Sequence, residues 1–239
     1  MRPLPCRVTG ALSLAAALLV VTLPSSGAAV SALQSWTLEH GERPLPDEVP
    51  EAVGGVLQPQ ALTLRDGDSG VMDLWLTESL PPATGKAATG ELVYPSIPVG
   101  TFMGVMRLEA DHIDYRDQTV PAGVYAVRYL QQPVDGAHVG VTFFRDFLAL
   151  TPLTARTTPE PVDFQAGLAR ALQLNPHPFV WALWPADEVY PPDESAEEPF
   201  LAEVESGKWA LRTTIPRDDG DPLALALVVV GSEPPEGYF

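Results

Sequence analysis

Three side chains near the middle of the chain have types that bind metal ions. His112 and Asp114 are two residues apart, so on an extended segment both side chains point to the same side. His138 follows at the tip of a predicted hairpin. Imidazole and carboxylate ligands suit zinc, copper or iron(II). We therefore take His112, Asp114 and His138 as candidate ligands of a divalent metal, the one cofactor that the sequence suggests. No H-x-H or H-E-x-x-H spacing is present, and hydrogen bonding within its own turn is the alternative role of His138.

Two further residue types could serve binding. Met103 and Met106 would suit copper(I) together with His112, but in a regular strand their spacing puts them on opposite faces, so we predict that they fill the core. Large aromatic side chains could form a platform for a sugar or a peptide, although in a chain of this length most belong to the core. Trp184 is the exception, because it precedes Pro185 at the start of an acidic loop. It is our candidate ligand-binding residue.

Catalytic chemistry has little support in the sequence. There is no G-x-S-x-G motif, and the only cysteine, Cys6, lies in the amino-terminal segment. A pair of carboxylates could act as acid and base, but with 31 acidic residues no pair stands out. The net charge of −17 repels phosphate backbones and anionic lipid headgroups, which argues against nucleic-acid and membrane-surface partners. The residues therefore favour a non-enzymatic role.

The first 32 residues have the pattern of an export signal. Arg2 and Arg7 precede an apolar run from 11 to 23, and small residues follow. Cleavage is predicted after Ala32, with Ala28 as the second choice. The apolar run is shorter than the roughly 20 residues that a membrane span needs, although an uncleaved anchor is the alternative. The sequence therefore predicts Sec-type export to the periplasm or the exterior.

The rest of the chain is predicted to form short strands. Residues 33–58 read as a loose lead-in segment, and residues 59–239 as a single domain with about ten strands. The abundant turn residues and 26 prolines favour short strands with many loops. One helix is predicted near residues 160–174, with Asp163 as its N-cap. Strands at this spacing are typical of a sandwich or barrel, and we predict an antiparallel β-sandwich of the jelly-roll or immunoglobulin-like kind. The predicted strands are 60–64, 71–76, 91–94, 100–108, 124–130, 139–143, 147–150, 179–184, 208–215 and 223–230.

The stretch 114–153 carries the strongest pattern. A Pro121-Ala122-Gly123 turn opens the strand 124–130, and Asp135-Gly136 predicts a hairpin that returns along 139–143. Arg128 lies on a mostly apolar face of this strand, and we predict that it pairs with a carboxylate such as Asp146, because an unpaired buried guanidinium is costly.

The Pro-Ala-Gly-x-Tyr turn and the Asp-Gly-x-His turn after it resemble those of small exported bacterial β-sandwich proteins of unknown function. The likeness covers roughly residues 110–153. It implies the fold class and no activity. With these patterns, we expect an exported, non-catalytic binding or envelope-accessory protein whose partner is an unknown protein or glycan. The alternative is a metal-binding protein or metal-dependent enzyme that uses His112, Asp114 and His138.

Overall fold

The computed structural model describes residues 36–132, 142–193 and 195–233. The predicted signal peptide, 1–32, and its cleavage positions lie outside these ranges. Of the helices within the ranges, none has both the length and the apolar character that crossing a membrane requires. All of the described residues belong to one structural unit, which spans 34–239.

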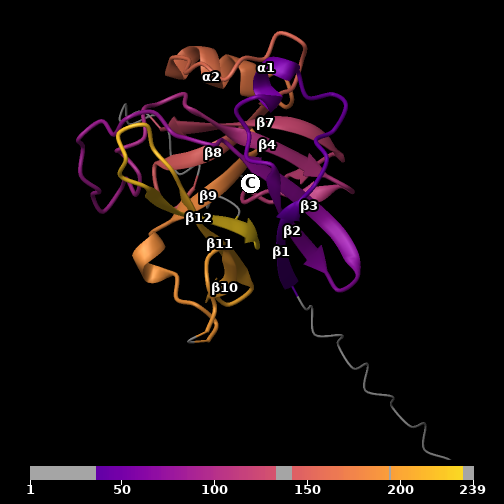
Figure 1. Ribbon diagram of the computed structural model, residues 1–239, viewed down its shortest axis with the longest axis vertical. Helices are drawn as coiled ribbons and strands as arrows, with labels where there is room; N and C mark the ends of the chain where they lie inside the picture. Colours follow the sequence, from indigo (N-terminus) through magenta and orange to yellow (C-terminus); the bar gives the residue numbers. More distant parts are fainter. Residues whose placement is uncertain (1–35, 133–141, 194, 234–239) are drawn as a thin grey trace, which may run out of the picture. The chain divides into compact units, whose positions relative to one another are not determined.

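Ten of the strands form one continuous antiparallel sheet (Figure 1). Its strand order is β1-β2-β3-β4-β7-β8-β9-β12-β11-β10, and β5 and β6 pair separately. The strands are β1 (Trp36–Glu42), β2 (Gln60–Asp66), β3 (Ser69–Leu76), β4 (Phe102–Leu108), β5 (His112–Ile113), β6 (Thr119–Val120), β7 (Gly123–Gln131), β8 (Asp146–Pro152), β9 (Val180–Trp184), β10 (Phe200–Glu205), β11 (Lys208–Ile215) and β12 (Leu223–Val230). The helices are α1 (Glu51–Gly54), α2 (Phe164–Ala171) and the short 3-10 helix η1 (Ala186–Glu188).

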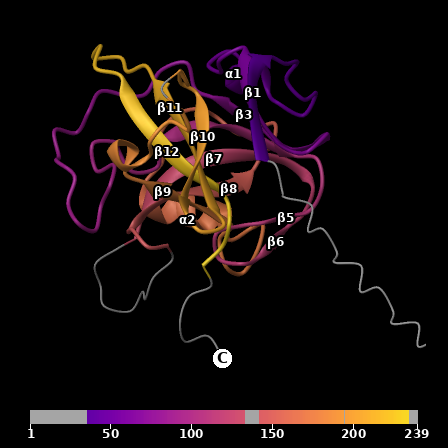
Figure 2. The same cartoon turned by 90° about the horizontal axis from the view of Figure 1, so that it is seen from below.

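The mainly-β class and the antiparallel pairing are confirmed, but the predicted sandwich is not. The ten strands curve into one nearly barrel-shaped sheet (Figure 2). The edge strands β1 and β10 approach each other without pairing. A small cavity of about 160 Å³ lies between the two ends of the sheet, lined by His40 of β1 and by Glu198 and Pro199 just before β10.

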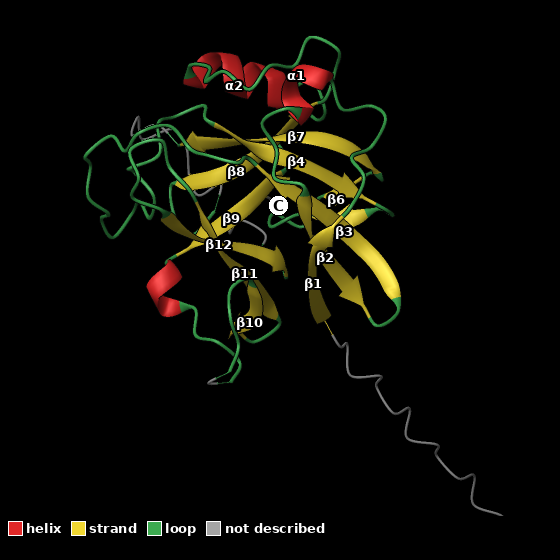
Figure 3. Ribbon diagram, viewed as in Figure 1, coloured by secondary structure: helices red, strands yellow, loops and turns green. Residues whose placement is uncertain are grey.

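Apolar side chains cover both faces of the sheet, and β7 shows how. Its side chains alternate between a central core on one face and outer clusters on the other. Tyr125, Val127 and Tyr129 point into the central core with the leucines of β2 and β3. Ala126 and Leu130 point outward, as the alternation of a strand requires. Helix α1 covers the first of these outer regions and α2 the second, and Figure 3 shows both helices on the same side of the sheet.

Helix α2 begins where the sequence predicts. The carboxylate of Asp163 accepts a hydrogen bond from the backbone N–H of Ala166 at 2.8 Å, which satisfies a donor that the first turn leaves unpaired. The helix itself is shorter than predicted and ends at Ala171.

Within the predicted loose lead-in segment, the described residues 36–58 form regular structure that begins with the strand β1. All seven residues of β1 pair with β2, from Trp36 opposite Asp66 to Glu42 opposite Gln60. The following turn is held by the indole N–H of Trp75, which donates to the carbonyl of Arg43 at 3.3 Å. Val53 of α1 is fully buried against the sheet. Residues 36–58 are therefore an integral part of the folded unit.

The central hairpin also differs from its prediction. The strand opened by the Pro-Ala-Gly turn is confirmed as β7, but its partner is β8, with Tyr129 opposite Leu148 and Gln131 opposite Asp146. Phe143, expected on the return strand, is 69% exposed. The Asp135-Gly136 turn and residues 133–141 lie outside the described residues. The apolar run beginning at Phe147 is the true return strand.

A β-bulge changes the positions of the two methionines. Phe102 pairs with Arg128 and Gly104 with Val127, so Met103 is an extra residue on β4. The extra residue shifts the alternation, and Met103 and Met106 both lie in the central core rather than on opposite faces. Gly104 has a φ of +154°, and a Cβ there would meet the carbonyl oxygen of Trp75 at 2.1 Å.

The predicted ion pair of Arg128 with Asp146 is replaced by a different arrangement. The buried guanidinium donates to three backbone carbonyls, those of Gly100 at 2.9 Å, Glu160 at 3.0 Å and Thr158 at 2.6 Å. Carbonyl oxygens supply the partners that a buried cation requires, so a carboxylate is not needed. Arg128 thereby fastens the segment before α2 onto the outer face of the sheet. Burial lowers the pKa of Arg128 to about 10.

Candidate functional site

One groove in the described structure lies where two strands of the sheet separate. β9 and β12 pair through only two register positions, Ala226 with Trp184 and Leu227 with Leu183. Directly after Trp184 the chain turns away at Pro185 and forms η1. Proline has no backbone N–H, so the pairing cannot continue through that residue. The first residues of β12 therefore have no strand partner on the β9 side within the described part of the chain.

The hydroxyl of Tyr94 lies at the point of separation. It donates to the carbonyl of Trp184 at 2.7 Å and accepts from the backbone N–H of Ala226 at 2.8 Å. One phenol thus bridges two strands that would otherwise bond to each other directly. Burial raises the pKa of Tyr94 above its ordinary value, so the hydroxyl keeps its proton and its donor role.

Asp146 holds the backbone of Tyr94 and of the residue before it. Its fully buried carboxylate accepts from the backbone N–H groups of Val93 at 3.0 Å and Tyr94 at 2.5 Å. The hydroxyl of Tyr129 donates to the Tyr94 carbonyl at 2.7 Å and lies 3.2 Å from the same carboxylate. Gln131 donates in turn to the Tyr129 hydroxyl at 2.7 Å. This network of buried polar groups fixes the loop before β4 as one wall of the groove.

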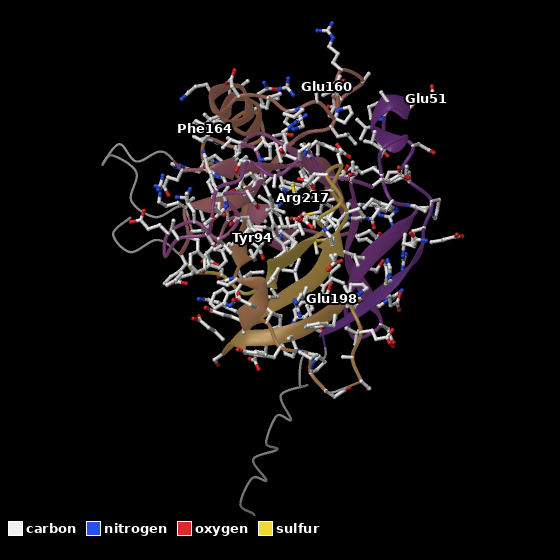
Figure 4. The ribbon with its side chains drawn as sticks, turned by 60° about the vertical axis from the view of Figure 1, so that its left-hand side comes forward. Glu51, Tyr94, Glu160, Phe164, Glu198 and Arg217 are labelled. Carbon is white, nitrogen blue, oxygen red and sulfur yellow. The ribbon has the colours of Figure 1, made fainter. Side chains whose placement is uncertain are left out.

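A second anchor holds the far end of the same wall. The guanidinium of Arg217, itself nearly buried, donates to the hydroxyl of Ser96 at 2.8 Å and to the Ser96 carbonyl at 3.3 Å. Figure 4 labels Arg217 and Tyr94. Thr84 also bonds this wall, through its backbone N–H to the Ser96 carbonyl at 2.9 Å. The wall is therefore pinned at both ends, and the groove exists before any ligand arrives.

The groove has a volume of about 540 Å³, within the usual range of small-ligand sites. Its lining combines apolar and aromatic surface with a few charged side chains. The apolar and aromatic residues include Val93, Tyr94, Pro95, Phe144, Pro185 and Leu223, and the charged residues are Lys86, Asp187, Glu188 and Arg212. A mostly apolar cleft with a few polar groups is the ordinary composition of a ligand site.

Trp184, the predicted ligand-binding residue, lies beside the groove and supports its wall. Its half-buried indole packs against two phenylalanines, stacked on Phe143 at 6.5 Å and edge-to-face with Phe144 at 6.2 Å between ring centroids. Phe144 lines the groove, whereas Trp184 contacts Phe144 and is not itself a lining residue. A role of Trp184 in contacting a ligand stays a prediction.

The candidate metal ligands are only partly within the described residues. His112 lies on β5, where its ring stacks on Trp181 at 6.3 Å and its Nε2 is 3.3 Å from the carbonyl oxygen of Val229. Burial lowers the pKa of His112. His138 belongs to the segment 133–141, which lies outside the described residues.

Asp114 is buried and heavily engaged. Its carboxylate accepts from the backbone N–H groups of Arg116, Gln118 and Val180 and from the side-chain amide of Gln118, at 2.9–3.0 Å. Burial raises the pKa of Asp114, while these hydrogen bonds oppose the shift. Within the described ranges, no group of three or more histidine, cysteine, aspartate or glutamate side chains is placed to hold a metal ion. The metal site stays a prediction.

Sequence reasoning missed the residues that build the groove. Tyr94 was expected on a short strand, 91–94, and it lies instead in a loop. Asp146 was considered only as a partner for Arg128. Tyr94 meets Asp146 across 52 positions and Ala226 across 132 positions, and no local periodicity reports contacts of that range.

Comparisons with known proteins add nothing to these residues. No protein-family model matches the chain, and the searches of curated proteins and of solved structures give no match.

Proposed function

We propose that this chain is a non-catalytic binding protein that takes its ligand in the groove between β12, η1 and the wall 93–96. The main support for this proposal is that the groove is preformed. Tyr94 separates two strands, and Asp146 and Arg217 hold the wall around it. Preorganised sites bind more tightly because less conformational entropy is lost on binding. The apolar lining with a few charges is suited to recognition.

The proposed setting is the periplasm or the exterior. The arginines and apolar run of residues 1–32 support Sec-type export, and the acidic composition supports a role that avoids nucleic acids and anionic lipids. In that setting the protein would act as an envelope-accessory or secreted recognition module.

Fragment mapping by NMR tests the location of the site. The ¹⁵N-labelled full chain is titrated with a panel of N-acetyl amino-acid amides and monosaccharides. We expect shift changes to gather on the amides of Lys86, Ser96, Ala186 and Ala224, because these residues line the groove.

A bulky substitution provides the control for that experiment. Ala186→Trp places an indole in the groove and should abolish the shifts, whereas Ala155→Trp, at an exposed turn outside the lining, should leave them unchanged. Shifts that gather elsewhere, or that survive Ala186→Trp, would remove the groove from consideration.

A further inference from the structure

The floor of the groove is an unpaired strand edge. In an antiparallel strand both backbone groups of a residue point to the same side, and the side alternates along the chain. The N–H of Ala226 points toward β9, because it bonds to the Tyr94 hydroxyl there. Ala224, two residues earlier, therefore directs its N–H and C=O to the same side, which is the groove.

Ala224 has no hydrogen-bond partner on that side among the described residues. On the opposite side its register neighbour is Thr214 of β11. On the groove side, β9 has ended at Trp184, and η1 offers no strand. An exposed donor and acceptor on one residue of a strand edge match the backbone of another extended chain.

The charges around this edge favour a cationic partner. Arg212 is already paired with Glu198, with 3.3 Å between Nε and Oε1. Asp187 and Glu188 make no ion pair in the described structure, and Lys86 is the remaining charged residue of the lining. Among the described residues, the lining thus holds two carboxylates and one ammonium that form no ion pair, in a chain whose net charge is −17. A partner with basic side chains gains from this arrangement.

We propose that the groove takes an extended peptide, which pairs with the backbone of Ala224 as an added strand and places a basic side chain beside Asp187 and Glu188. Alternate side chains of such a peptide point to opposite sides, and the apolar surface of Val93, Pro95 and Leu223 receives those on one side. This inference rests on the proposed function, since it names the ligand class of the same groove.

The first test uses a defined peptide on the full chain. The probe is acetyl-Val-Lys-Val-Lys-Val-amide, compared with the same peptide carrying glutamate in place of lysine, and binding is followed by NMR. The lysine peptide should shift the Ala224 amide, and the glutamate peptide should bind several-fold more weakly. Methylating one internal backbone nitrogen at a time should weaken binding by about tenfold or more at one position, because it removes the donor that pairs with Ala224.

The second test uses a matched pair of variants. Asp187→Asn with Glu188→Gln should remove the preference for the lysine peptide. Asp47→Asn with Glu48→Gln changes the same dipeptide at an exposed turn outside the groove and should leave the preference intact. Both pairs change the net charge equally, so a general effect of charge would appear in both.

The outcomes separate this inference from the proposed function. If N-methylation has no effect at any position, or if the glutamate peptide binds as tightly, the extended-peptide assignment is overturned. If the fragments map to the groove but only monosaccharides bind there, the ligand is a glycan and the proposed function stands. If neither fragments nor peptides shift the groove amides, both proposals are overturned.

Discussion

Removing the hydroxyl of Tyr94 tests the arrangement that opens the groove. Tyr94→Phe keeps the ring, which is 5% exposed, and deletes only the atom that bridges Trp184 and Ala226. Both partners are backbone groups in the interior of the sheet. The substitution therefore leaves one carbonyl and one N–H unsatisfied unless the two strands move together.

The expected loss of stability follows from these two groups. A buried backbone group that loses its partner costs about 1–3 kcal/mol, so the two together predict a loss of about 2–6 kcal/mol. That is a large part of the about 5–15 kcal/mol that stabilises a typical domain. With a urea m-value of about 2 kcal/mol per molar, the unfolding midpoint should fall by about 1–3 M.

Urea unfolding followed by tryptophan fluorescence measures this shift. Tyr190→Phe is the matched control, because Tyr190 is 72% exposed and its loss of a hydroxyl should change stability by about 0.5 kcal/mol or less. Equal midpoints for the two variants would refute the role of the bridge. A second readout is alkaline: burial raises the pKa of Tyr94 above the unfolded value of about 10, so the stability of the native protein should fall as the pH rises above 10. In Tyr94→Phe this fall should be smaller.

Three other predictions follow from the fold. Burial lowers the pKa of His112, so the protein should lose stability as the pH falls below about 6.5, and His112→Phe should reduce that loss in urea midpoints compared at pH 7 and pH 5. Arg128→Met leaves three carbonyls without their donor and should lower the free energy of unfolding by about 3–5 kcal/mol. Arg156→Met, at an exposed position, should leave it unchanged. Similar melting temperatures for the two variants would contradict the role given to Arg128. Gly104→Ala should lower the free energy of unfolding by about 3 kcal/mol or more, because the added Cβ would meet the Trp75 carbonyl oxygen. Gly207→Ala has open space around it and should cost about 1–2 kcal/mol, from its positive φ alone. Equal melting temperatures for the two variants would show that the close contact does not matter.

Local patterns predicted most of the sheet. The apolar runs of β2, β3, β4, β7, β9, β11 and β12 were identified because their side chains alternate or are wholly buried. Asp163 was identified as an N-cap because its carboxylate accepts a hydrogen bond from a residue only three positions later in the chain. Such features depend on neighbours in the sequence, and the sequence displays them directly.

The missed features depend on distant neighbours. β1 has mostly exposed side chains, so no apolar alternation marked it, and its pairing with β2 decides its structure. The bulge at Met103 depends on the register between β4 and β7, which a single strand does not display. The groove depends on Tyr94, Asp146 and Ala226, which are far apart in the chain. For the same reason, the carbonyl partners of Arg128 were not predictable from its own strand.

The strand order has a consequence for how the chain completes its folding. The first seven strands of the sheet follow the order of the sequence, so each can pair with a strand that has already been synthesised. The last three run in reverse, and β12 joins β9 to the hairpin of β10 and β11. A chain that stopped before residue 223 would therefore lack β12 and would also leave β10 and β11 without their attachment to β9. Because Ala224 and the Tyr94 bridge depend on the same strand, the groove would form only after β12 has been synthesised, and a chain cut before β12 would expose the edge of β9 to aggregation.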